Sequence, residues 1–140
     1  MQATFFSGFS DTSEALDFML ENIHSNFQIG NKVFLNLDNN LLAKFEDLKR
    51  KKFHETNNLA FLYNKNVQVN GEIGDKSFDE AHVLSSEINL SEENFLSAFI
   101  YTTEADSNIL KTSRELYSKL QKANIEVKDE KIYWKQSIIL

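Results

Sequence analysis

The stretch VQVNGEIGDKS, residues 67–77, carries the strongest local signal in the chain for how the strands are arranged. Val67 and Val69 alternate with polar residues, which is typical of a strand with one buried face. Asn70 and Gly71 follow, and an Asn-Gly pair between extended segments favours a type I′ turn because both residues tolerate positive φ. The stretch therefore predicts a β-hairpin and antiparallel pairing in the sheet.

The same stretch has part of the composition of a phosphate-binding loop, because Lys76 and Ser77 follow two glycines. A phosphate-binding loop requires G-x-x-x-x-G-K-[ST], with the lysine directly after the second glycine at a junction from strand to helix. Here Asp75 separates Gly74 from Lys76, and its carboxylate would repel the phosphates. The sequence thus predicts a turn and not a nucleotide site.

Hydrophobic periodicity predicts the elements on either side of this turn. The segment FLSAFIYTT is ambiguous, because its β-branched and aromatic content favours a strand while the preceding SEEN favours the start of a helix. We predict a helix there. The predicted helices are 12–26, 40–53, 92–103 and 107–123, and the predicted strands are 3–6, 32–37, 59–63, 67–69, 81–88 and a closing hairpin of 125–127 with 132–134 around Asp129 and Glu130.

Helices interleaved with hairpins predict one α+β domain, residues 1–140, with about four helices packed on a mixed or antiparallel sheet. The chain has no cysteine, no basic N-terminal end typical of a signal peptide and no apolar run near 18 residues. We therefore expect a cytoplasmic protein, monomeric or a small homo-oligomer, that makes no contact with membranes.

Motifs for catalysis are lacking: there is no nucleophile elbow, no paired histidine motif and no cysteine. We expect no cofactor and no metal, and an enzymatic role stays open with the balance against it. An enzyme or small-ligand site would centre on His82, because Asp75, Asp79 and Glu80 precede it within seven residues and could form a general-base pair with it.

The negative charge is concentrated in one region of the chain. The net charge is −6, yet residues 72–106 alone hold nine acidic residues and one lysine, Lys76. This acidity argues against nucleic-acid binding. A solvated surface would account for it, but so would a docking surface that attracts a basic protein by its field.

The first functional hypothesis is accordingly a neutralising protein that covers a basic partner. A bacterial or phage immunity protein that inhibits a nuclease toxin is the kind we predict, since nucleases carry basic surfaces to hold nucleic acid. The predicted partner-binding residues are Glu72, Asp75, Asp79, Glu80, Glu87, Glu92 and Glu93.

Overall fold

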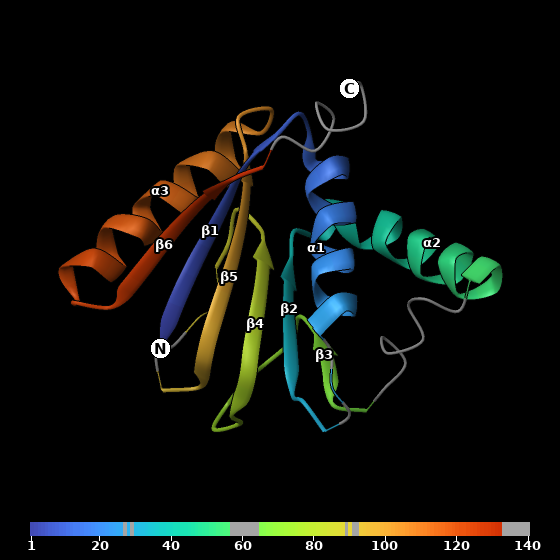
Figure 1. The fold of residues 1–140 in the computed structure, drawn as a ribbon, viewed down its shortest axis with the longest axis horizontal. Helices are drawn as coiled ribbons and strands as arrows, with labels where there is room; N and C mark the ends of the chain where they lie inside the picture. The colour runs from blue at the N-terminus through green and yellow to red at the C-terminus, as the bar shows by residue number, and fades with distance from the viewer. Residues whose placement is uncertain (27, 29, 57–64, 89, 91–92, 133–140) are drawn as a thin grey trace.

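The computed structural model describes residues 1–26, 28, 30–56, 65–88, 90 and 93–132. Its centre is a six-stranded sheet in which every strand pair is parallel, in the order β3-β2-β4-β5-β1-β6 (Figure 1). The elements are β1 (Gln2–Phe9), α1 (Thr12–Asn26), β2 (Val33–Leu37), α2 (Asn39–Thr56), β3 (Val67–Val69), β4 (Phe78–Leu84), β5 (Phe95–Thr103), α3 (Ser107–Lys122) and β6 (Glu126–Lys131).

Helices α1 and α3 cover opposite faces of this sheet. Neighbouring residues of β1 point to opposite sides, so that Phe6 packs in one core cluster with Met19 of α1, whereas Phe5 packs in another with Leu120 of α3. The crossover from β1 to β2 passes β5 and β4 in one direction, and the crossover from β5 to β6 passes β1 in the other. Because both crossovers are expected to be right-handed, they place their helices on opposite faces.

The prediction of an α+β domain with a mixed or antiparallel sheet and about four helices is wrong, because the fold is α/β with an all-parallel sheet and three helices among the described residues. One error is the helix predicted at 92–103, where β5 lies. In β5, Ala98 and Ile100 pack on the side of α3, while Tyr101 packs on the side of α1. A parallel strand buried on both faces has an almost continuous apolar sequence, and this pattern outweighed the local helix-start signal.

The two predicted hairpins are the other errors. Asn70 and Gly71 do adopt positive φ, 54° and 83°. However, β3 pairs with one edge of β2 and β4 with the other, so β2 lies between the two strands that flank the turn. At the C-terminal end, Asp129 and Glu130 lie inside β6, which pairs in parallel with β1. A turn sequence therefore fixes the local backbone without fixing which strands pair.

Most other predicted elements are close to those observed. Helices 12–26, 40–53 and 107–123 correspond to α1, α2 and α3, and strands 3–6 and 32–37 to β1 and β2. The predicted strand 59–63 and the end of the closing hairpin, 133–134, lie outside the described residues. The stretch GEIGDKS leads into strand β4, so it lacks the helix that a phosphate-binding loop requires. Among the described residues, no helix has the length and apolarity needed to cross a membrane.

Candidate functional site

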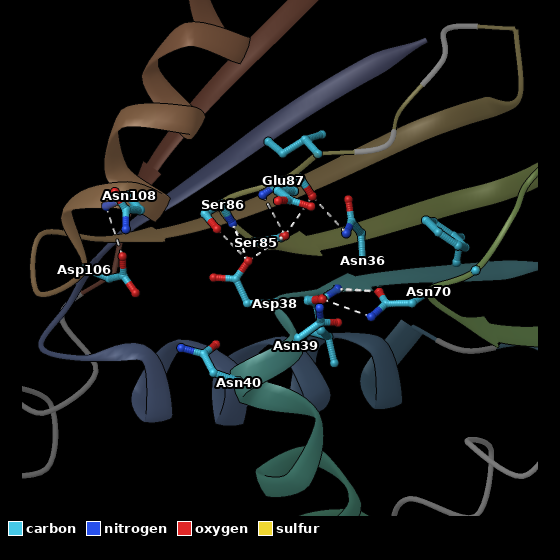
Figure 2. Close-up of a pocket in the computed structure, with 14 residues that line it drawn as sticks. Asn36, Asp38, Asn39, Asn40, Asn70, Ser85, Ser86, Glu87, Asp106 and Asn108 are labelled. Carbon is cyan, nitrogen blue, oxygen red and sulfur yellow. Dashed lines mark hydrogen bonds between the residues drawn. The ribbon is translucent and has the colours of Figure 1, made fainter.

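A cavity of about 590 Å³ opens at the carboxyl ends of β2, β3 and β4, beside the first turn of α3 (Figure 2). We call it the carboxyl-edge cavity. The chain leaves β2 through α2 toward β3, and it leaves β4 in the opposite direction toward β5. The cavity therefore lies at a topological switch point, and such crevices are where open parallel sheets bind ligands.

Asp38 is the first residue after β2, and its carboxylate is held on one side. Its Oδ1 atom accepts hydrogen bonds from the backbone nitrogen of Ser86 at 2.7 Å and from the Ser86 hydroxyl at 2.9 Å, and it lies 2.9 Å from the Ser85 hydroxyl. Figure 2 shows the second oxygen directed away from both serines, on the side of Asp106 and Asn40. One oxygen thus fixes the side chain while the other faces the cavity.

The loop after β4 is fixed to two neighbouring elements and by a hydrogen bond within the loop. The Nδ2 atom of Asn36, in β2, donates to the carbonyl oxygen of Glu87 at 3.2 Å, and Thr112 Oγ1, in α3, donates to the carbonyl oxygen of Ser86 at 2.8 Å. The Glu87 nitrogen donates to Ser85 Oγ at 3.0 Å. These bonds satisfy backbone groups that leave the sheet at this point, so this wall of the cavity is preorganised.

Asn70 closes the cavity on the side of β3. Its side-chain amide pairs with Leu37, accepting from the backbone nitrogen at 2.8 Å and donating to the carbonyl oxygen at 3.0 Å. The amide thus copies a strand backbone and extends the edge of the sheet by one pair. The positive φ that the sequence predicted here sets the direction of this side chain.

Two helices begin at the cavity, each directly after an aspartate. Asp106 Oδ1 caps α3 by accepting from the backbone nitrogens of Asn108 at 3.0 Å and Ile109 at 3.1 Å. Asp38 precedes α2, which starts at Asn39. The partial positive charge of a helix N-terminus favours an anion, and here the protein itself supplies two.

The cavity has a negative and strongly hydrogen-bonding lining. Asp38, Glu87 and Asp106 contribute carboxylates, five asparagines contribute amides, and none of the described lining residues is Lys or Arg. Among the residues described, no group of three or more His, Asp or Glu side chains is arranged to hold a metal ion. The cavity is therefore suited to donor groups such as hydroxyl and ammonium, and it disfavours phosphates.

His82, the predicted centre of an enzyme or ligand site, lies in the core and not in this cavity. It is 2% exposed, and its ring stacks on Phe99. Its Nδ1 atom lies 2.8 Å from Tyr101 Oη, and its Nε2 atom lies 3.0 Å from Glu80 Oε1. Tyr101 Oη in turn accepts from Asn22 Nδ2 at 2.9 Å. Burial lowers the pKa of His82, against the opposing effect of Glu80, and raises the pKa of the Tyr101 hydroxyl.

A neutral imidazole satisfies every partner in this chain of hydrogen bonds. With the proton on Nε2, His82 donates to Glu80, and Nδ1 accepts from the Tyr101 hydroxyl. The chain joins α1, β4 and β5 inside the core. We interpret it as a structural network, because buried polar groups are costly unless all of them are paired.

The seven acids predicted to bind a partner are divided between the two edges of the sheet. Glu87 lies at the carboxyl edge, while Asp79 lies at the amino edge, where its Oδ2 accepts from the Lys32 nitrogen at 2.9 Å. Strand β4, seven residues long, separates them by roughly 20 Å at about 3.3 Å per residue. A high density of acids in the sequence is therefore not one patch on the surface.

The other predicted acids are also dispersed. Glu72 follows Gly71 at the end of β3 and Glu93 precedes β5, both exposed, whereas Glu80 is turned toward His82. Asp75 shares a depression at the amino edge with three lysines, Lys32, Lys65 and Lys76. Glu92 lies outside the described residues. Of the six described acids among them, only Glu87 lines the carboxyl-edge cavity.

Reasoning from the sequence missed the remaining cavity residues. Each of the main ones comes within two residues of the end of a strand, and this was the available signal. They are Asp38 after β2, Asn70 after β3, and Ser85 and Ser86 after β4. Such residues converge only when the strands are parallel. The predicted hairpins implied antiparallel strands, whose carboxyl ends lie at opposite edges of the sheet. Comparison of the sequence with protein-family models and with curated proteins finds no match.

Proposed function

We propose that the protein binds a small polyhydroxylated molecule without negative charge, such as a sugar or a nucleoside, in the carboxyl-edge cavity. This proposal keeps the ligand-binding alternative predicted from the sequence and moves its site away from His82, which is buried and fully paired. The volume of about 590 Å³ lies in the range of small-molecule sites.

The observation that carries the proposal is the one-sided binding of Asp38. Its Oδ1 atom is occupied by Ser86 and approached by Ser85, so the side chain cannot turn without losing those bonds. No hydrogen bond from the described residues reaches the Oδ2 atom, so its lone pairs are available to a ligand. A carboxylate at the end of a parallel strand is well suited to accept hydrogen bonds from neighbouring hydroxyl groups. The asparagine amides offer further donors and acceptors beside it.

The charge of the lining selects among such ligands. A phosphate group would meet three carboxylates and no cationic side chain among the described lining residues. The two helix N-termini do not reverse this, because Asp38 and Asp106 already lie next to them. We therefore expect the unphosphorylated form of a sugar or nucleoside to bind and the phosphorylated form to be rejected.

The test is an NMR titration of the ¹⁵N-labelled protein with D-ribose, D-glucose and adenosine, each compared with its phosphorylated counterpart. We expect shifts for residues 36–40 and 85–88 with the uncharged probes, and affinity lower by at least about tenfold, or 1.4 kcal/mol, for the phosphates. In Asp38→Asn the amide oxygen can still accept from the two serines, but an NH₂ group replaces Oδ2. Because this group donates and cannot accept, the variant should bind the uncharged probes more weakly.

Asp75→Asn is the matched control, because it removes the same charge at the opposite edge of the sheet. It should leave binding unchanged. If none of the uncharged probes shifts the cavity residues, or if the phosphorylated probes bind there more tightly, the proposal is wrong.

A second candidate is the basic protein partner, approached through this edge of the sheet. The observation in its favour is that Asp38, Glu87 and Asp106 surround one depression without Lys or Arg among its described lining. The association rate with a purified basic nuclease should then fall with salt, and Glu87→Lys should slow it. Association that is equally fast for the wild type and Glu87→Lys would exclude this candidate.

A further inference from the structure

A second cavity, of about 490 Å³, lies between α3 and the carboxyl halves of β1, β5 and β6. We call it the α3 groove. From the helix it is lined by Leu110, Ser113, Arg114 and Tyr117, which recur at the spacing of one helix face. A helix normally covers a sheet with close-packed apolar side chains, so a cavity with both polar and apolar walls at this position requires an explanation.

On the sheet face toward α3, three adjacent strands change from apolar to polar toward their carboxyl ends. Within each strand the two residues point to the same face, toward α3, because they are two positions apart. The pairs are Phe5 and Ser7 in β1, Ile100 and Thr102 in β5, and Val127 and Asp129 in β6. The first member of each pair packs in the core cluster beneath α3, and the second lines the groove.

A β-bulge in β1 lies beside Thr102 of β5. Phe6 pairs with Tyr101 and Phe9 with Thr103, so two residues of β1 face the single residue Thr102. One of them is Gly8, whose φ is +92°. Any larger residue would bring a Cβ atom into collision with the carbonyl oxygen of Ile132. Bulges of this kind redirect side chains and occur frequently beside functional sites.

Thr102 supplies the observation that points to a ligand. It is 8% exposed, it lines the groove, and its Oγ1 atom has no hydrogen-bond partner among the described residues. Its neighbour Thr103 behaves in the ordinary way, donating from Oγ1 to the Phe9 carbonyl oxygen at 2.8 Å. A buried hydroxyl without a partner is costly, and it is explained if a bound molecule supplies the missing hydrogen bond.

The charges of the groove indicate what kind of molecule this is. Glu104 and Asp129 are balanced by Arg114 and Lys131, so the lining as a whole is neutral. The ion pairs found in the described part of the chain do not include Arg114, which leaves its guanidinium available to a carboxylate. Asp129 Oδ2 accepts from the Tyr117 hydroxyl at 2.9 Å, which orients the second charge.

We propose that the α3 groove binds an α-amino acid with an apolar side chain. Arg114 takes the carboxylate, Asp129 takes the ammonium group, and Thr102 gives or accepts the hydrogen bond that its hydroxyl now lacks. The apolar side chain lies against Phe5 and Leu110. A zwitterion suits a lining with both charges and no net charge, and the apolar walls suit its side chain.

The experiment is isothermal titration calorimetry of the full chain with L-leucine and L-phenylalanine. Two truncated probes, 4-methylpentanoate without the ammonium group and isopentylamine without the carboxylate, test each charge separately. We expect the amino acids to bind and each truncated probe to bind at least about tenfold more weakly, since one hydrogen-bonded charge contact is lost. No binding of either amino acid at millimolar concentration overturns the proposal.

The variants Thr102→Val and Arg114→Gln should each weaken binding of L-leucine by about tenfold. Lys119→Gln removes a charge from the same helix outside the groove and should bind normally, as should Asp38→Asn, which belongs to the other cavity. Circular dichroism and thermal unfolding verify that Thr102→Val is folded. A folded Thr102→Val protein with unchanged affinity, or equal affinity for 4-methylpentanoate, contradicts the assignment.

Discussion

Replacing Thr102 by valine should make the protein more stable, which is unusual for a buried position. Thr102 Oγ1 is buried and has no hydrogen-bond partner among the described residues. Valine has nearly the same shape and an equally strong preference for strands, so the substitution exchanges a hydroxyl for a methyl group with little other change.

The magnitude follows from the state of that hydroxyl. An unsatisfied buried polar group costs about 1–3 kcal/mol, and burying a methyl group in its place is worth roughly 0.8 kcal/mol. We therefore expect the free energy of unfolding to rise by about 1–3 kcal/mol in the absence of ligand. For a chain of this size this corresponds to roughly 3–9 °C in the midpoint of thermal unfolding.

The next residue provides a control of opposite sign. Thr103 is 1% exposed, donates to the Phe9 carbonyl oxygen and accepts from the Ala105 nitrogen at 3.2 Å. Thr103→Val leaves both partners unsatisfied and should cost about 2–4 kcal/mol. Urea unfolding of both variants measures the difference. If Thr102→Val loses as much stability as Thr103→Val, the hydroxyl of Thr102 has a partner and the reasoning fails.

Three further predictions concern the fold. Gly8→Ala should lower the free energy of unfolding, measured in urea, by at least about 2 kcal/mol, because the added Cβ would meet the Ile132 carbonyl oxygen. Gly74 also has positive φ but open space around it, so Gly74→Ala should lower this free energy by only about 1 kcal/mol. Asn70→Ala should cost about 1–2 kcal/mol, since both of its bonds to the end of β2 are lost, and an unchanged urea midpoint would contradict this. Burial lowers the pKa of His82, so the unfolded chain takes up a proton between pH 6.5 and 5 that the folded chain does not. The free energy of unfolding of the wild type should therefore fall by up to about 2 kcal/mol over this range, and it should fall by less in His82→Gln.

The sequence predicted what depends on neighbours along the chain. The helix at 12–26 has the same bounds as α1, because its apolar spacing and its capping aspartate act within a few residues. The turn at Asn70 and Gly71 was also correct in its backbone angles. The segment around Phe99 was assigned wrongly because its state is decided by β4 and β1 on either side, which contribute nothing to a local pattern.

Strand direction explains why the residues of the carboxyl-edge cavity escaped prediction. Asp38 and Ser85 are 47 residues apart, and they meet because β2 and β4 run in the same direction and end at the same edge. An antiparallel pair would have placed the two ends at opposite edges.

The acids predicted to bind a partner are separated by the same geometry. Strand β4 runs from one edge of the sheet to the other, so Asp79 lies at the amino edge and Glu87 at the carboxyl edge. In a parallel sheet, residues on either side of a strand are separated and residues after different strands are brought together. Polar residues that follow the strands are therefore better indicators of a site here than the acid-rich run of the sequence. Titrating Asp38→Asn and Asp75→Asn side by side compares these two indicators directly.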